Sequence, residues 1–206
     1  MSAKYVIITR FPLKEQTDTH KFNTLKNKNK NKNNKKYFIS DEQGINELLE
    51  LRSFSSIDEI SESENELESA FKSFSSILSG DIRRELVKFV EAPIDSEDDL
   101  PVTEYIQLRH VEVPAENYKQ YRQWREETIF NVVRENKEKI TSFEAYHSLI
   151  SGQPGVMFIS AFNVDKESYL EVFTNERYLN IIQQAGDNYI TGGNGGLYTR
   201  IYRSIS

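Results

Sequence analysis

Arginine, tyrosine and polar side chains that could bind or protonate a small molecule gather in the second half of this 206-residue chain. An arginine can hold a carboxylate or phenolate through paired N–H donors, and a tyrosine hydroxyl can donate a proton. We take Arg109 and Arg200 as candidate anion-binding residues and Tyr146 as a candidate proton donor. The full candidate set is Gln107, Arg109, Glu144, Tyr146, Tyr198, Arg200 and Tyr202.

These side chains form one site only if neighbouring strands present them on one face of a sheet. Successive side chains of a strand point to opposite faces, so alternation sorts them into two sets. The face that carries the candidate set is amphipathic, because it also carries Tyr105, Phe158, Ser160 and Phe162, and such a face is typical of a ligand cavity or a barrel interior. The blander set is expected to meet helices and comprises Ile106, Leu108, Met157, Ile159, Ala161, Leu197, Thr199 and Ile201.

A structural role is the competing interpretation of the same charged residues. Buried arginines need partners. Glu144 is the expected partner in the second half, and Glu50 with Arg52 gives a similar arrangement in the first half. Ion pairs that seal an interface perturb charges as active sites do, so we give the structural interpretation greater weight for these residues.

Other familiar chemistries find little support in the sequence. The chain has no cysteine, which removes thiolate nucleophiles and cysteine metal sites. His20, His110 and His147 lack the spacing of a metal site. The glycine-rich segment 192–196 precedes a predicted strand, whereas phosphate-binding loops open a helix, so we interpret it as a loop over the cavity. We therefore expect no metal and no cofactor.

The charge and composition of the chain argue against nucleic acids and membranes as partners. A net charge of −6 argues against a dedicated nucleic-acid-binding protein. The lysine- and asparagine-rich run 26–36 has no interleaved aromatic residue for base stacking and no amphipathic face, so we interpret it as a solvated loop. No stretch of about 18 apolar residues occurs and the first residues lack a signal-peptide pattern, so we expect no membrane contact and a cytoplasmic protein by default.

The elements that would position the candidate residues are clearest after residue 102. Period-two apolar patterns predict the strands, Pro114 opens a helix with an aromatic stripe, and Asp165 and Asn175 cap two later helices. The predicted strands of this half are 103–113, 140–150, 156–162 and 197–204.

The first half follows the same order with weaker signals. Its predicted strands are 4–11, 37–40, 45–54 and 85–91, and a capping box at Ser56 to Glu59 begins a helix that ends before Gly80. The sequence thus predicts two β-α-β-β-α-β repeats of the ferredoxin-like type, 1–93 and 103–206, joined by an acidic linker, 94–102. The first helix of the first repeat has degenerated into the 26–36 run. A site is therefore expected to lie mainly in the second repeat.

Each repeat covers one face of its sheet with helices and must bury the other face. The economical solution is an α+β fold in which the two antiparallel sheets face each other as a barrel within one chain. The stretch from Leu108 to Trp124 (LRHVEVPAENYKQYRQW) resembles the dimeric α+β barrel superfamily, which includes the NIPSNAP, EthD-like and antibiotic-biosynthesis-monooxygenase-like families. The resemblance implies a monomer with a pseudo-dimeric barrel, or a homodimer of such chains.

Haem-degrading members of that superfamily place an asparagine, a tryptophan and a histidine around the haem. Here Gln107 and Trp124 stand nearest to the first two, and the helical histidine has no counterpart, so that site is not transferred. Two hypotheses result. The first is a small-molecule-binding barrel, as a cofactor-independent oxygenase or isomerase acting on an aromatic or polyketide-like compound. The second is a non-catalytic structural or protein-interaction barrel whose interior is filled with side chains.

Overall fold

The computed structural model describes residues 1–15, 34–152, 155–191 and 197–205. In this part of the chain eight antiparallel strands close into a barrel, in the order β1-β3-β2-β8-β5-β7-β6-β4. Their bounds are β1 Tyr5–Pro12, β2 Lys35–Ser40, β3 Glu47–Phe54, β4 Arg83–Ile94, β5 Tyr105–Val111, β6 Ser142–Ile150, β7 Val156–Phe162 and β8 Leu197–Ser204.

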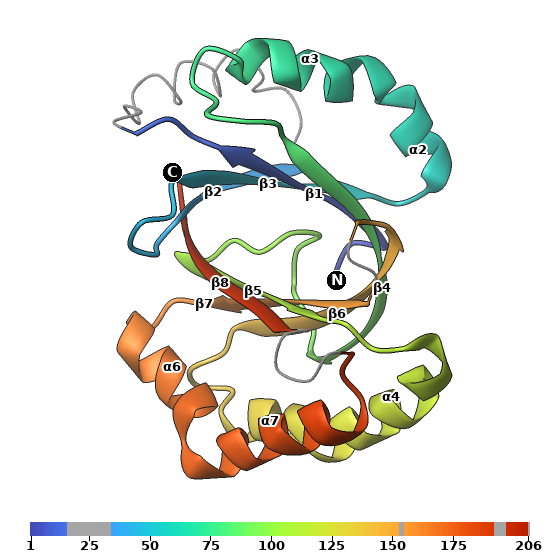
Figure 1. Cartoon of the computed structure of the whole chain (residues 1–206), viewed down its shortest axis with the longest axis vertical. Coiled ribbons are helices and arrows are strands. Elements are labelled where there is room, and N and C mark those ends of the chain that lie inside the picture. Colours follow the sequence, from blue (N-terminus) through green and yellow to red (C-terminus); the bar gives the residue numbers. More distant parts are fainter. Residues whose placement is uncertain (16–33, 153–154, 192–196, 206) are drawn as a thin grey trace.

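Helices lie on the outside of the barrel, on two opposite sides (Figure 1). The first-half helices cover the sheet that contains β1 and β3, and the second-half helices cover the sheet that contains β5 and β7. Among the described residues, every helix is too short or too polar to cross a bilayer. The helices are α2 Ile57–Glu62, α3 Glu64–Phe74, the 3-10 turn η1 Ala115–Asn117, α4 Tyr118–Glu127, α5 Ile129–Glu135, α6 Lys166–Thr174 and α7 Glu176–Asn188.

The two halves of the chain contribute four neighbouring strands each. The first half runs β4-β1-β3-β2 around the barrel and the second half runs β8-β5-β7-β6. Pairing of β2 with β8 and of β4 with β6 joins the halves and closes the barrel. The predicted α+β barrel with an antiparallel sheet is thereby confirmed.

Local sequence signals explain where several helices begin. The predicted caps are confirmed, because the side chain of Ser56 accepts from the Glu59 amide, and Asp165 and Asn175 act in the same way for α6 and α7. Two helix ends differ from prediction. Helix α3 stops at Phe74, and α7 continues past Gly186 to Asn188.

The middle of the barrel is filled by apolar side chains from both halves. This interior cluster has almost no exposed surface and joins facing strands across the barrel, so the two halves share one core. It consists of Ala3, Val6, Ile8, Phe38, Leu49, Leu51, Val87, Leu100, Ile106, Leu108, Tyr146, Met157, Ile159, Ala161 and Tyr202.

The predicted faces of β5 and β7 are reversed in the structure. Ile106 and Leu108 were expected to meet helices, but they lie in the interior cluster, and so do Met157 and Ile159 of β7. Strand pairing shows why, because Ile106 lies opposite Tyr202 and therefore shares its face. Polarity does not indicate which face of these strands points into the barrel. The barrel centre is apolar, and the helix layer supplies polar partners for the other face.

The predicted linker 94–102 does not run freely over the surface. Strand β4 continues to Ile94, the amide of Ala3 donates to the carbonyl of Asp99 (3.1 Å), and Leu100 is buried in the interior cluster. The N-terminal residues also lie inside this end of the barrel (Figure 1). One end of the barrel is therefore closed by chain. Most of the predicted loop 26–36 and the glycine-rich segment 192–196 lie outside the described residues.

Candidate functional site

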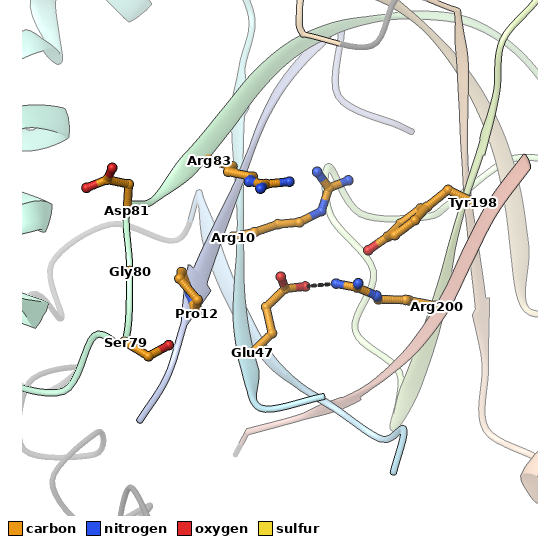
Figure 2. A pocket seen from close by; sticks show the side chains of 9 residues that line it. All are labelled: Arg10, Pro12, Glu47, Ser79, Gly80, Asp81, Arg83, Tyr198 and Arg200. Atoms are coloured by element: carbon orange, nitrogen blue, oxygen red, sulfur yellow. Dashed lines mark hydrogen bonds and ion pairs between the residues drawn. The ribbon is translucent and has the colours of Figure 1, made fainter. Parts of the chain in front are cut away.

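A cavity of about 690 Å³ lies at the barrel end opposite the N-terminal residues, where strands from both halves meet (Figure 2). Its lining is mostly polar and contains three arginines. Only two of the lining residues belong to the second half, so the expectation of a site built mainly from that half is not met here. The lining residues are Arg10, Pro12, Glu47, Ser79, Gly80, Asp81, Arg83, Tyr198 and Arg200.

Glu47 of β3 organises one wall of this cavity. Its Oε1 accepts a hydrogen bond from Arg200 Nη1 (2.8 Å) and another from the Tyr202 hydroxyl (2.7 Å). The hydroxyls of Tyr198 and Tyr202 lie 3.4 Å apart. Burial raises the pKa of both tyrosines, and the Glu47 carboxylate raises them further, so both hydroxyls stay protonated and can donate.

Two guanidinium groups lie over the ring of Tyr198. The central carbon of Arg200 is 4.7 Å from the ring centroid and that of Arg10 is 5.2 Å from it. Such cation–π contacts stabilise a cation that has lost part of its hydration. The tyrosine therefore holds one arginine from each half of the chain at the same cavity.

Arg10 is also paired with a carboxylate. Its Nη2 lies 2.7 Å from Oε1 of Glu85, which is buried beside it on β4. Burial alone would lower the pKa of Arg10, but the Glu85 carboxylate and nearby tyrosines raise it above its ordinary value. Arg10 is thus a permanent cation at the cavity.

The structure places the seven predicted site residues in three different regions. Tyr198 and Arg200 line the cavity, with Tyr202 directly behind them. Gln107 and Arg109 lie on the helix side of the sheet. The Tyr169 hydroxyl of α6 donates to Gln107 Oε1 (3.1 Å), and Arg109 donates to the Tyr178 hydroxyl of α7.

Those helix contacts correct the predicted orientation of Gln107 and Arg109. The guanidinium of Arg109 also lies 5.1 Å from the ring centroid of Phe173 on α6. The tyrosine and phenylalanine side chains of the helices provide hydrogen-bond and cation–π partners for the amide of Gln107 and the guanidinium of Arg109. The sequence pattern of β5 alone does not reveal these partners. The two residues form part of the packing between sheet and helices.

Glu144 and Tyr146 lie in the barrel, with Glu144 at the end that the N-terminal residues close. Both side chains are fully buried, and the Tyr146 hydroxyl donates to Glu144 Oε2 (3.1 Å). The other carboxyl oxygen of Glu144 has no hydrogen-bond partner among the described residues. Burial raises the pKa of Glu144 to about 7, above its ordinary 4.5.

The predicted arginine partners of the glutamates are wrong. Glu144 pairs with Tyr146, and Arg200 pairs with Glu47. In the first half, Glu50 accepts from the Tyr37 hydroxyl (2.6 Å). Arg52 donates to Ser63 and Glu66 of the helix layer, both at 2.9 Å.

The histidines give no metal centre in the described part of the chain. No group of three histidine, cysteine, aspartate or glutamate side chains there could hold an ion. His147 stacks on Tyr118, with ring centroids 4.7 Å apart, and His110 is buried on β5. His20 lies outside the described residues.

A second hollow of about 430 Å³ lies beside the stacked rings of Tyr118 and His147. Its other walls are largely apolar or backbone, from Val113, Pro114 and Gly155 among others. Burial and the nearby Arg125 lower the pKa of His147, so the ring is neutral near pH 7. This hollow lacks the convergent charges that distinguish the arginine-lined cavity.

Among the lining residues that sequence reasoning missed, Arg10, Glu47 and Arg83 are the ones whose charged groups are directed into the cavity. All three stand at strand ends of the first half, where the predicted repeat was weakest. A charged residue at the end of an otherwise apolar strand, such as Arg10 in YVIITRFP, was the available signal. Such residues mark the rim of a barrel, because the rim is where strands leave the dry interior.

No family model and no curated protein matches the sequence. Solved structures share its fold along nearly its whole length. A candidate monooxygenase from Fusobacterium nucleatum is 14% identical with a TM-score of 0.70, and the match covers 100% of this chain and 94% of the other. An anthrone oxidase-like protein is 10% identical with a TM-score of 0.67, covering 98% and 91%.

A heme-degrading enzyme from Listeria monocytogenes is 10% identical with a TM-score of 0.57, covering 97% of this chain and 99% of the other. Similarity at these identities shows the fold alone. The comparisons therefore confirm the predicted α+β barrel fold.

Proposed function

We propose that this protein binds a small organic molecule in the arginine-lined cavity at the barrel end. The observation that carries the proposal is the cavity itself. Its volume of about 690 Å³ falls in the range of roughly 300–1,000 Å³ typical of small-molecule sites. Buried or half-buried polar groups from β1, β3 and β8 converge on it, and these fix the orientation of a ligand in such sites.

The favoured form of this function is a cofactor-independent oxygenase or isomerase acting on an aromatic or polyketide-like compound. The names of two proteins with the same fold, a candidate monooxygenase and an anthrone oxidase-like protein, support this choice. In such an oxidation a methylene group becomes a carbonyl, while dioxygen gives one atom to the product and the other to water. In this proposal Tyr198 donates a hydrogen bond to the ligand, and Glu47 and Tyr202 position Arg200.

A second candidate function is a non-catalytic barrel that binds a protein partner. The filled middle of the barrel favours it, because the interior cluster packs side chains from both halves against one another. Two of the cavity arginines, Arg10 and Arg200, are also already paired with carboxylates. In that case the cavity is a solvated end of a structural barrel.

The architecture suits either function. We propose that the chain is a tandem repeat of one ferredoxin-like unit, with halves 1–93 and 103–206, since both halves show the same strand order. One chain then builds the barrel that a homodimer builds in single-unit proteins. Kinship with the NIPSNAP, EthD-like and antibiotic-biosynthesis-monooxygenase-like families belongs to the same proposal.

A ligand screen followed by thermal unfolding tests the binding function. We expect aromatic and polyketide-like compounds to raise the midpoint temperature, because a ligand that binds the folded state stabilises it. Ser79→Trp would fill the cavity and abolish the shift. Ser75→Trp adds the same ring at the exposed end of α3 and serves as the control. If no compound raises the midpoint temperature in a way that Ser79→Trp abolishes, the result favours the non-catalytic function.

A further inference from the structure

Two arginines stand directly opposite each other at the cavity. In the antiparallel pairing of β1 with β4, Arg10 is the register partner of Arg83. Directly opposed residues share a face of the sheet, and like charges in that position destabilise the pair. Figure 2 shows both guanidinium groups directed into the cavity, on the side of Tyr198. The sheet therefore carries an unfavourable pair at this point.

The carboxylates around the cavity match the arginines in number, but only two of them are paired with a guanidinium group. Glu85 lies 2.7 Å from Arg10 and Glu47 lies 2.8 Å from Arg200. Arg83 has no ion-pair partner in the part of the chain that the structure describes. Asp81 also lines the cavity, but its carboxylate is turned away from the guanidinium groups (Figure 2). One guanidinium group, that of Arg83, thus faces the cavity without a carboxylate paired with it.

We propose that the ligand carries an anionic group, a carboxylate or an enolate, which binds between Arg83 and Arg10. This inference rests on the proposed small-molecule function and names the class of ligand. A guanidinium offers paired donors that match a carboxylate, and the anion would relieve the repulsion between the two opposed arginines. The organic part of the ligand occupies the rest of the cavity, whose volume far exceeds that of an inorganic anion.

Arg200 has a different role in this arrangement. Its Nη1 donates to the same oxygen of Glu47 that accepts from Tyr202, and its guanidinium also lies over the Tyr198 ring. These contacts fix its position and offset its charge. Arg200 is therefore a positioning residue for the wall, whereas Arg83 contacts the anion.

Binding of a matched pair of probes tests the inference. The probes are 2-naphthoate and its neutral analogue 2-naphthamide, with inorganic phosphate as a ring-free anion, each titrated by calorimetry. We expect 2-naphthoate to bind about tenfold more tightly than the amide, as one charge-assisted contact implies, and more tightly than phosphate. Added salt should weaken the binding of 2-naphthoate and leave that of the amide unchanged.

Charge-matched variants locate the contact. Arg83→Gln should lose about tenfold in affinity for 2-naphthoate and nothing for 2-naphthamide. Arg203→Gln removes the same charge from an exposed position on β8 outside the cavity, and we expect it to bind both probes as the unmodified protein does. The NMR signals of the arginine Nε–Hε groups should shift for Arg10 and Arg83 when 2-naphthoate is added.

The outcomes separate this inference from the proposed function. If the acid and the amide bind with equal affinity and Ser79→Trp abolishes the binding of both, the preference for an anion is overturned. The proposed small-molecule site would then still stand. Equal losses in the Arg83 and Arg203 variants would also overturn it, because binding would then depend on overall charge. If neither probe nor phosphate binds, the inference fails, and the thermal-unfolding screen with uncharged compounds then decides the proposed small-molecule function by itself.

Discussion

Tyr146 donates a hydrogen bond to Glu144 Oε2 over 3.1 Å, and both side chains are sealed from solvent inside the barrel. Burial is the main cause that raises the pKa of both groups, and Asp95, from the segment that closes this end, raises both further, as Asp99 does for Tyr146. The two ends of the barrel are therefore opposite in character. One holds a buried acid that favours its neutral form, and the other presents arginines to a cavity.

The buried acid should make stability depend on pH near neutrality. Glu144 has a pKa of about 7 in the folded protein and an ordinary value of 4.5. Between these values the folded state binds the extra proton, so the free energy of unfolding falls as pH rises from 4.5 to 7 and then levels off. The loss is on the order of 3 kcal/mol, since one pKa unit corresponds to about 1.4 kcal/mol.

Glu144→Gln isolates this effect, because an amide keeps the shape of the protonated acid and does not titrate. We expect the variant to equal the unmodified protein in urea unfolding at pH 5 and to exceed it in stability at pH 8. Other acids titrate in both proteins and cancel in the difference. A constant difference between the two proteins from pH 5 to pH 8 would show that Glu144 ionises normally.

Most strand positions and helix caps could be predicted because the signals that specify them are local. Strand β7 reads as a continuous apolar run, and Asp165 and Asn175 are followed at once by helix-forming residues. The face of β5 could not be predicted in the same way. Gln107 and Arg109 are stabilised by Tyr169 and Tyr178, more than sixty residues away in the chain, and no local pattern encodes that contact.

The cavity escaped prediction for a related reason. Its opposed pair, Arg10 and Arg83, comes from β1 and β4, which are adjacent in the barrel but separated by more than seventy residues. Arg200 was identified from the second half, whereas its partner Glu47 lies in the first. Alternation indicates the face of a strand but not its neighbour or register, and the site depends on both.

An ion pair between the halves should contribute strongly to stability. Arg125 of α4 is fully buried and donates from Nε (3.0 Å) and Nη2 (2.5 Å) to Oε1 of Glu91 on β4. Breaking a buried pair leaves a charge poorly compensated, so Arg125→Met should lower the free energy of unfolding by about 2–4 kcal/mol. Chemical denaturation at neutral pH measures it.

The matched control is Arg134→Met, which removes an exposed pair with Glu126 (2.7 Å). We expect that change to cost less than about 1 kcal/mol. Arg122 also donates a hydrogen bond to Glu91, so it should reduce the loss of stability in the Arg125 variant. Equal losses in the two variants would mean that the buried pair adds nothing beyond an ordinary surface contact.

Glycine is required where β7 begins. Gly155 has φ of +142°, and a Cβ at this position would lie 2.3 Å from the carbonyl oxygen of Val111 on β5. Gly155→Ala should therefore destabilise the protein by about 3 kcal/mol. Gly152→Ala is the control, because a Cβ there meets nothing within 4 Å and should change stability by less than about 1 kcal/mol. Similar thermal midpoints for the two variants would contradict the geometry.

The final prediction concerns Glu47, whose negative charge offsets that of Arg200 at the cavity wall. Glu47→Gln leaves an oxygen that can still accept from Arg200 and Tyr202 but removes the charge. The cavity then gains a full positive charge, so we expect the affinity for 2-naphthoate to rise about threefold to tenfold and that for 2-naphthamide to stay the same. The free energy of unfolding should fall by about 1–2 kcal/mol, because two neighbouring groups lose a charge-assisted partner.

Opposite changes in affinity and stability distinguish this variant from a general loosening of the fold. If the substitution disordered the cavity wall, the affinity for both probes would fall together. If Glu47 had no influence on the cavity, the affinity for both probes would stay unchanged. Glu42→Gln provides the comparison, since Glu42 accepts from the backbone amide of Ile201 on the same strand as Arg200 but does not line the cavity. If Glu42→Gln tightens 2-naphthoate as much as Glu47→Gln does, the gain comes from net charge and not from the release of Arg200.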